Sequence, residues 1–207
     1  MKKIISLLLC LSMLFLISCK KVPTKVGNYT VKISKTPTNY VMIVMKNGDA
    51  MLLELYPDAA PITVENFKGL VAEKYYDGII FHRVISNFMI QGGDPNGDGY
   101  SNNDKPTIKG EFALNGYNNP IAHERGVISM ARSNNPDSAS TQFFIVHKTS
   151  STNSSSLDGK YAAFGRLLAG YDTLDKIASV RTNTSDKPLQ TQKMKMVRFV
   201  TIVSDGE

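Results

Sequence analysis

Most of the chain alternates short apolar segments with turns rich in Gly, Asn and Pro. Residues 40–46 and 50–56 flank Asn47-Gly48, a dipeptide that favours the tight turn of a β-hairpin. Further segments of strand length follow at residues 79–85, 88–91, 127–131, 143–146, 163–168 and 196–203. Many short strands separated by turn residues are typical of a β-sandwich or a closed barrel.

Two segments follow the period of an amphipathic helix instead. Residues 61–74 have Thr63 as the expected N-cap and one apolar face, formed by Val64, Phe67, Leu70 and Val71. Residues 172–180 repeat this pattern over a shorter length. The sequence therefore predicts a mainly β fold, a closed eight-stranded antiparallel β-barrel capped by two α-helices.

The first residues have the features of an export signal. Two lysines precede residues 4–17, an apolar segment shorter than a membrane-spanning helix requires. It ends in Leu16-Ile17-Ser18-Cys19, which resembles a bacterial lipobox, so residues 1–18 are predicted to be a lipoprotein signal peptide and Cys19 the lipidated residue. The alternatives are an ordinary signal peptide with a chance cysteine and an uncleaved anchor. Lipidation implies a protein anchored to a membrane of the bacterial cell envelope, facing the periplasm or the exterior.

Composition and charge narrow the classes of function. Cys10 lies within the predicted signal, so the chain after Cys19 has no cysteine for a disulfide or for thiol chemistry. The formal net charge of +6 is dispersed, and no basic stripe with interleaved aromatic residues indicates nucleic-acid binding. Residues 19–38, rich in Lys, Thr and Pro, are expected to form a tether, in which residues 29–33 could pair as an extra strand. Residues 39–207 form the expected domain, which we expect to be monomeric.

One motif imitates a metal site. Asp94-Pro95-Asn96-Gly97-Asp98-Gly99 matches the start of a calcium-binding loop, but Lys105 occupies the position of the required bidentate glutamate. The three histidines show no ligand spacing, and His82 is expected to be structural. No metal or cofactor is therefore expected, and the motif predicts a Gly/Asn turn.

The candidate chemistry is concentrated in Phe81-His82-Arg83-Val84-Ile85, followed by Phe88-Met89-Ile90-Gln91-Gly92-Gly93-Asp94. These segments place a cation and a glutamine among apolar side chains and contain no nucleophile. They resemble the signature of the cyclophilins, the peptidyl-prolyl isomerases. The resemblance continues in the same order from about Tyr40 to the C-terminus, through Glu65-Asn66-Phe67, Gly126-Val127-Ile128-Ser129-Met130-Ala131, Gln142-Phe143-Phe144-Ile145, Leu157-Asp158-Gly159-Lys160-Tyr161 and Phe164-Gly165.

The resemblance implies a role for each matched residue. Arg83 would be the catalytic cation, and Gln91 would hydrogen-bond the substrate and help to hold the arginine. Ala131 and Gln142 would line the groove for the residues that precede the proline. The wall of the proline pocket would be formed by Phe88, Met89, Phe144 and Leu157.

Other positions in the matched segments are expected to differ in role. Tyr161 stands where many family members have histidine, and it keeps an aromatic side chain that can hydrogen-bond. Phe81 and Phe143 are expected to face the core, because strand alternation points them away from their functional neighbours. Residues 149–156 are Ser-rich and are expected to form a loop longer than is usual in the family.

The physics of proline isomerisation explains why these residue types suffice. Rotation about an Xaa–Pro bond is slow because it breaks amide resonance, with a barrier of ~18–20 kcal/mol. In the twisted transition state the prolyl nitrogen regains its lone pair, so a guanidinium aimed at it binds that state better than the planar one. The sequence therefore predicts an isomerase without a cofactor, acting on Xaa–Pro segments of unfolded or flexible envelope proteins.

Two other classes of function are alternatives to this prediction. A proline-peptide binding or chaperone module with incidental turnover would use the same pocket. The intact Arg83 favours the enzyme, because a pure binder has no need of a group that stabilises the transition state. A structural or adhesive surface lipoprotein would need exposed repeats, and the sequence contains none.

Overall fold

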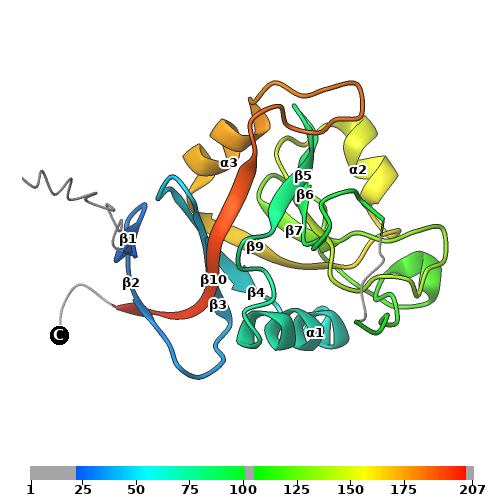
Figure 1. Ribbon diagram of the computed structural model, residues 1–207. Helices are drawn as coiled ribbons and strands as arrows, with labels where there is room; N and C mark the ends of the chain where they lie inside the picture. The colour runs from blue at the N-terminus through cyan, green and yellow to red at the C-terminus, as the bar shows by residue number, and fades with distance from the viewer. Residues whose placement is uncertain (1–21, 101–104, 204–207) are drawn as a thin grey trace, which may run out of the picture.

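The computed structural model describes residues 22–100 and 105–203 (Figure 1). The main body is a closed barrel of antiparallel strands in the order β10-β3-β4-β9-β7-β8-β6-β5, in which β5 returns to β10. The barrel strands are β3 (Tyr40–Met45), β4 (Ala50–Leu55), β5 (Ile80–Ile85), β6 (Met89–Gly92), β7 (Val127–Met130), β8 (Phe143–Val146), β9 (Ala163–Ala169) and β10 (Gln192–Val203). The predicted eight-stranded antiparallel barrel is confirmed.

Strand β10 closes the barrel and has three partners in succession. Its first two residues, Gln192 and Lys193, pair with Phe81 and Ile80 of β5. Its middle pairs with β3, and its last residues pair with β2 outside the barrel. One strand of 12 residues therefore joins the two edges of the barrel and also carries an additional layer.

Helices cover the two ends of the barrel. Helix α1 (Pro61–Ala72) lies across one end and α3 (Tyr171–Ala178) across the other (Figure 1), so both predicted helices are present. Phe67 of α1 enters the barrel, where its ring centroid lies 5.1–5.7 Å from those of Tyr76, Phe143 and Phe164. Edge-to-face and tilted aromatic pairs at this distance add to the stabilisation that burial provides.

The start of α1 differs from the prediction. Thr63 is not the N-cap: the helix begins at Pro61, and Ala60 occupies the cap position without a side-chain hydrogen bond. The N–H groups of Ile62 and Thr63 instead donate to the two carboxylate oxygens of Glu111, at 3.0 and 2.8 Å, and the hydroxyl of Thr63 donates to the same carboxylate at 2.7 Å. A buried glutamate distant in the sequence thus supplies the acceptor that a local cap would provide.

A third helix, α2 (Ser151–Leu157), occupies the segment predicted to be a loop, so that prediction is wrong. Serine has only moderate helix propensity, so this Ser-rich segment has no helical signal in the sequence. The helix ends in Leu157, which is buried, and the ammonium of Lys160 donates to the carbonyl oxygen of Ser155 at 2.8 Å. The packing of Leu157 with Met89 and Phe144 therefore holds the C-terminal end of this segment. A short 3₁₀-helix, η1 (Ala113–Asn115), precedes β7.

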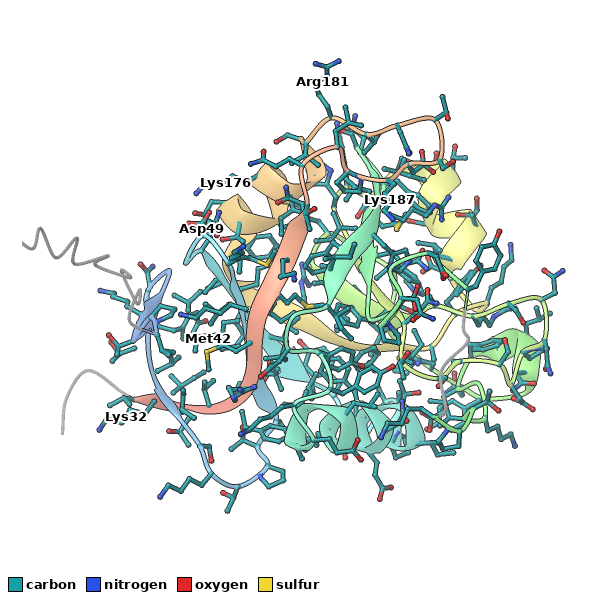
Figure 2. The ribbon with its side chains drawn as sticks, in the orientation of Figure 1. Lys32, Met42, Asp49, Lys176, Arg181 and Lys187 are labelled. Atoms are coloured by element: carbon teal, nitrogen blue, oxygen red, sulfur yellow. The ribbon has the colours of Figure 1, made fainter. Side chains whose placement is uncertain are left out.

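The predicted tether is partly wrong, because residues 25–33 belong to the sheet. Strands β1 (Lys25–Val26) and β2 (Tyr29–Ile33) pair with each other, and β2 pairs with β10, which confirms the extra strand at residues 29–33. They cover an apolar cluster on the outside of the barrel that includes Val26, Val31, Met42, Val44, Leu52 and Val200. Figure 2 shows Met42 pointing from the barrel wall toward these strands.

The predicted signal peptide and Cys19 lie outside the described residues. Within the described residues, none of the helices has the length and apolar character needed to cross a membrane.

Replacing Glu111 tests the long-range cap of α1. Glu111→Ala is expected to lower the free energy of unfolding by about 2–3 kcal/mol, because backbone N–H groups at the helix start lose a charged acceptor. Urea unfolding followed by circular dichroism measures this change. The matched control is Glu65→Ala, which removes an exposed carboxylate from the same helix and should change stability by no more than about 0.5 kcal/mol. Equal losses in the two variants would contradict the assigned role of Glu111.

Candidate active site

The predicted site residues meet on the outer face of the barrel. Arg83 of β5 pairs across the sheet with Gln91 of β6, Gln91 pairs with Phe144 of β8, and Phe144 pairs with Ser129 of β7. Cross-strand partners point to the same side of a sheet. The sequence neighbours of this row, such as Ile90 and Phe143, belong to the core inside the barrel. Four strands therefore place one continuous row of side chains on the outer face of the barrel, with the exposed Arg83 at one end and the fully buried Ser129 at the other.

A β-bulge in β5 sets the direction of Arg83. Regular alternation would place Arg83 on the same face as Phe81, which is fully buried in the barrel. Phe81 pairs with Gly92 and Arg83 with the adjacent Gln91, so β5 has one more residue than β6 in this interval. Phe81 faces the core as expected, but the cause is this bulge rather than simple alternation.

A hollow of about 200 Å³ lies over this row. It is lined by eight of the predicted site residues together with Arg132: Arg83, Phe88, Met89, Gln91, Ala131, Phe144, Leu157 and Tyr161. The ninth, Gln142, lines an adjacent hollow of about 250 Å³, which shares Gln91, Ala131 and Arg132 with the first. The fold thus gathers all the predicted side chains into two contiguous hollows.

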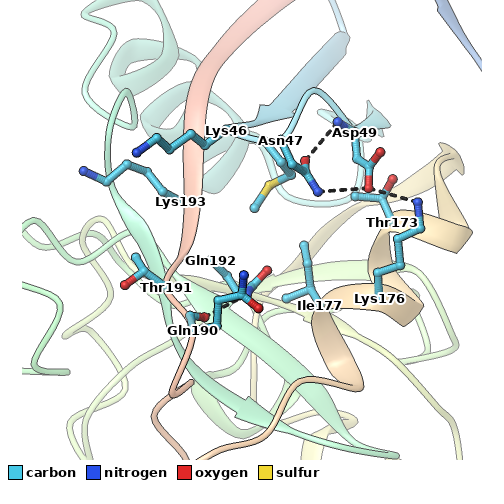
Figure 3. A pocket seen from close by; sticks show the side chains of 11 residues that line it. Lys46, Asn47, Asp49, Thr173, Lys176, Ile177, Gln190, Thr191, Gln192 and Lys193 are labelled. Carbon is cyan, nitrogen blue, oxygen red and sulfur yellow. Dashed lines mark hydrogen bonds and ion pairs between the residues drawn. The ribbon is translucent and has the colours of Figure 1, made fainter.

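A larger hollow of about 400 Å³ lies elsewhere, between the β3–β4 turn, α3 and the start of β10. Figure 3 shows Lys46 and Lys193 side by side at one rim and the ion pair between Asp49 and Lys176 at another. No aromatic side chain lines this hollow. A proline ring needs an apolar slot, so the smaller hollow fits the predicted chemistry better.

The polar contacts in the site differ from one prediction. The Nε–H of Arg83 donates to Asp186 Oδ2 at 3.2 Å, while the Gln91 side-chain amide donates to Gln142 Oε1 at 2.9 Å. Among the described residues Gln91 makes no hydrogen bond to Arg83, so the expectation that it helps to hold the arginine is not met. Asp186 gave no signal in the sequence, because it lies 103 residues from Arg83 in a surface loop.

Similarity to known proteins assigns this chain to a family. The family model "cyclophilin type peptidyl-prolyl cis-trans isomerase/CLD" matches residues 40–199. This chain belongs to the cyclophilin family, and it is a peptidyl-prolyl cis-trans isomerase. A peptidyl-prolyl cis-trans isomerase from Acinetobacter baylyi is 42% identical over 167 residues, covering 78% of this chain and 86% of that protein. Isomerase A from Dickeya dadantii is 35% identical over 178 residues, covering 82% and 90%.

A solved structure agrees with this assignment. The crystal structure of a Cryptosporidium parvum cyclophilin type peptidyl-prolyl cis-trans isomerase superposes on this chain with a TM-score of 0.68 at 29% identity. The match covers 81% of this chain and 98% of that one. The likeness therefore extends over the whole barrel of that protein rather than over a single motif.

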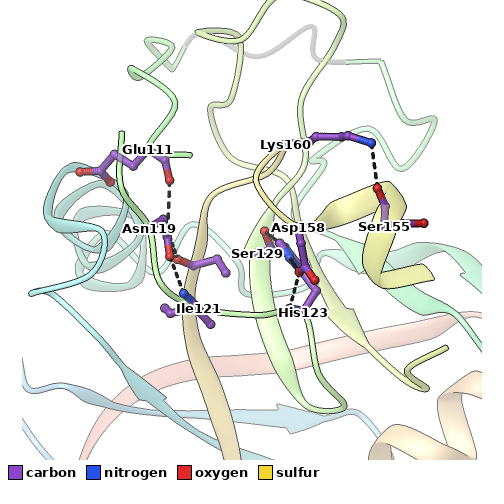
Figure 4. A network of polar contacts seen from close by, with 9 residues as sticks. Glu111, Asn119, Ile121, His123, Ser129, Ser155, Asp158 and Lys160 are labelled. Carbon is purple, nitrogen blue, oxygen red and sulfur yellow. Dashed lines mark hydrogen bonds and ion pairs between the residues drawn. The ribbon is translucent and has the colours of Figure 1, made fainter. Parts of the chain in front are cut away.

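In this cyclophilin a buried histidine supports the pocket wall (Figure 4). His123 Nδ1 lies 2.9 Å from Asp158 Oδ1, and its Nε2 lies 2.9 Å from the hydroxyl oxygen of Ser129. An ionised carboxylate only accepts, so Nδ1 carries the proton and Nε2 accepts from Ser129. The imidazole also stacks on Phe144, with ring centroids 5.9 Å apart.

This Ser–His–Asp arrangement is not a nucleophilic triad. The side chain of Ser129 is fully buried and His123 is 1% exposed, so a substrate cannot reach either group. Asp158 directly follows Leu157 of the pocket wall, and the backbone N–H of His123 donates to the same carboxylate at 2.7 Å. The network therefore fixes the pocket wall rather than performing chemistry.

Arg132 is a groove residue that sequence reasoning missed, although it directly follows the matched segment ending at Ala131. Its guanidinium lies between two rings, 5.0 Å from the centroid of Phe112 and 4.8 Å from that of Tyr161. It also donates to the carbonyl oxygens of Lys160 and Ser133, at 2.9 and 2.8 Å. These contacts hold Tyr161 in the lining of the smaller hollow.

In the segment that resembles a calcium loop, the first carboxylate accepts hydrogen bonds from the backbone of the segment itself. Asp94 is 1% exposed and accepts the backbone N–H groups of Asn96, Asp98 and Gly99 at 3.2, 2.8 and 2.7 Å. Among residues 22–100 and 105–203, no three His, Cys, Asp or Glu side chains are grouped to hold a metal ion.

The buried histidines predict a pH dependence of stability. Burial lowers the pKa of His123 and that of His82, and nearby carboxylates only partly oppose this effect. As the pH falls through about 6.5, the unfolded chain binds protons that the folded protein excludes. The free energy of unfolding should therefore be lower at pH 5.5 than at pH 7.5.

Urea titrations at the two pH values measure this difference. In a His82→Leu variant the loss between pH 7.5 and pH 5.5 should be smaller, because one of the two buried groups is gone. Equal or greater stability of the parent at pH 5.5 would contradict the prediction.

Proposed function

We propose that this cyclophilin accelerates Xaa–Pro rotation through Arg83, which stabilises the twisted amide, and that its clients are unfolded or flexible proteins of the bacterial envelope. The observation that supports this mechanism is the position of the guanidinium. The Arg83 side chain lines the same hollow as the apolar side chains of Phe88, Met89, Phe144 and Leu157. A proline ring in that hollow would bring its nitrogen to the side on which Arg83 lies.

The chemistry of this arrangement needs no covalent step. The apolar wall would bind the ring and exclude water from the amide, which strengthens any hydrogen bond made there. Arg83 would then donate to the nitrogen lone pair that exists only in the twisted state, and this preference for the transition state constitutes the catalysis. The uncatalysed process takes tens of seconds, and reaching milliseconds requires roughly 10⁴-fold acceleration, or about 5.5 kcal/mol.

The second hollow would orient the part of the peptide that precedes the Xaa–Pro bond. That bond rotates and is not broken. Gln142 and Gln91 hydrogen-bond each other at the junction of the two hollows. A side-chain amide can both donate and accept hydrogen bonds, which suits a peptide backbone in an extended conformation. The residues that precede the proline would therefore lie over Ala131 and Gln142.

The cellular setting rests on the N-terminal sequence. The apolar segment before Cys19 and the absence of any later cysteine support lipidation at that residue. Strand β1 begins at Lys25, so only residues 20–24 separate the proposed lipid site from the folded domain. In Figure 1, β1 and β2 lie on the side of the molecule opposite α2, which contributes Leu157 to the pocket. An anchor at Cys19 would therefore leave the groove directed away from its point of attachment.

Arg83→Ala tests the mechanism. We expect kcat/KM for a short prolyl peptide to fall at least about 100-fold, equivalent to ~2.7 kcal/mol, because the twisted nitrogen loses its donor. The melting temperature should change little, since the side chain is partly exposed. The matched control is Arg181→Ala, whose side chain points away from the molecule in Figure 2 and whose activity should equal that of the parent. Activity of Arg83→Ala within threefold of the parent would mean that something other than Arg83 stabilises the twisted nitrogen.

Cys19→Ser tests the anchor. The variant expressed in a bacterial host should lose incorporation of labelled palmitate and should leave the membrane fraction, because no other cysteine follows in the chain. Its isomerase activity should match that of the parent. Palmitate that still enters the variant would contradict the lipoprotein assignment.

A further inference from the structure

The loop between α3 and β10 has a fixed conformation that its own hydrogen bonds maintain. The side-chain oxygen of Asn183 accepts the backbone N–H groups of Ser185 and Lys187, both at 3.0 Å. The backbone N–H of Asp186 donates to the carbonyl of Asn183 at 3.1 Å, and Asn183 in turn donates to the carbonyl of Lys187 at 2.9 Å. An asparagine that organises the loop around itself leaves Asp186 in one defined position.

The same loop is attached to the strand that carries Arg83. The backbone N–H of Val84 donates to the carbonyl oxygen of Asp186 at 2.8 Å. The ammonium of Lys187 reaches the carbonyl of Gly97 at 3.0 Å, so the loop also binds the turn that follows β6. Asp186 therefore lies beside the residue that follows Arg83, and its place relative to β5 is set by backbone contacts.

Asp186 reaches Arg83 from an unusual backbone conformation. Its φ of 60° lies in the left-handed region, which Asp and Asn tolerate better than most residues. From there its Oδ2 accepts the Nε–H of Arg83 at 3.2 Å. The two terminal nitrogens of Arg83 make no hydrogen bond to any of the described residues. The contact thus engages the inner nitrogen of the guanidinium and leaves the outer N–H groups for a ligand in the groove.

We infer that Asp186 is a positioning residue, which orients the guanidinium of Arg83 toward the proline pocket. The inference rests on the proposed role of Arg83. A long arginine side chain that is 44% exposed would otherwise sample several rotamers, and only some of them would direct an N–H group at the prolyl nitrogen. Gln91 does not make this contact among the described residues, because the hydrogen bond of the Arg83 Nε–H goes to Asp186 and the Gln91 amide N–H donates to Gln142.

The ion pair is expected to act on activity rather than on stability. Both side chains are substantially exposed, at 44% and 40%, and ion pairs in that environment contribute little to folding. Holding a donor in the productive direction has a larger effect on rate, because a small misplacement of a catalytic group is costly. Loss of Asp186 should thus be visible in kcat/KM while the melting temperature stays nearly constant.

Two substitutions distinguish the effect of the Asp186 side chain on activity from the effect of its backbone conformation. Asp186→Gly removes the carboxylate at a position where glycine is free of strain, and kcat/KM should fall about tenfold. Asp186→Asn keeps a neutral acceptor and tolerates the same backbone conformation, so its loss should be smaller, about threefold. The matched control is Lys74→Gly, which places glycine at another exposed residue with positive φ, after α1, and should keep parental activity.

A double-mutant cycle with Arg83→Ala tests whether Asp186 acts through the arginine. If it does, adding Asp186→Gly to Arg83→Ala should lower kcat/KM by no more than about twofold further. A full additional tenfold loss would overturn the inference and assign the loop a general structural role in the groove. Parental or raised activity of Asp186→Gly in the intact background would also overturn it, and a raised value would indicate that the pair competes with substrate.

The cycle also distinguishes this inference from the proposed mechanism. Parental activity of Arg83→Ala would refute the role of Arg83, and the inference with it. A strong loss in Arg83→Ala combined with parental activity of Asp186→Gly would refute only the inference. If Asp186→Gly does not fold, the Asp186→Asn variant decides: parental activity would overturn the inference, and a loss that disappears in the Arg83→Ala background would support it.

Discussion

The contact between β10 and β5 is the constraint on which the rest of this structure depends. Two residue pairs, Gln192 with Phe81 and Lys193 with Ile80, join the edges of the sheet and close the barrel. Closure removes the exposed edge that a twisted sheet of this size would otherwise present. It also determines where the segment before β10 must run, because residue 191 has to arrive beside the start of β5. The loop containing Asp186 is therefore laid along the strand that carries Arg83.

The closed barrel divides its side chains into an inner and an outer set, and the outer set forms the site. The interior is filled by rings such as those of Phe67, Phe143 and Phe164, so it has no room for a ligand. The outer face of β5, β6, β8 and β7 carries the pocket, and its support comes from outside the barrel. A buried His123, bonded to Asp158 and stacked on Phe144, holds the far wall, while the loop before β10 holds the arginine. The proposed mechanism would need this rigidity, because it relies on orientation and forms no covalent intermediate.

The same strand links the active domain to the N-terminal segment. Beyond residue 199, β10 leaves the barrel and pairs with β2, and the two N-terminal strands cover a second apolar cluster that includes Val31 and Met42. Residues 25–33 are thus part of the folded unit, whereas composition alone suggested a linker. A fragment that begins at residue 39 would expose this cluster, so activity measurements on the domain should start before β1.

Sequence alone determined the barrel and the identity of the pocket residues, because both depend on patterns that are local in the chain. Apolar runs on either side of Asn47-Gly48 specify a hairpin, and the segments around Arg83, Phe144 and Leu157 each carry recognisable residue types at fixed spacing. The tertiary structure decided everything that depends on contacts between distant segments. The cap of α1 comes from Glu111, and α2 ends in Leu157, which packs in a buried cluster with Met89 and Phe144. A bulge opposite Gly92 turns Arg83 out of the barrel, and an ion pair spanning 103 residues holds it there. None of these has a periodic or local signature, because each one exists only once the closed sheet has brought the partners together.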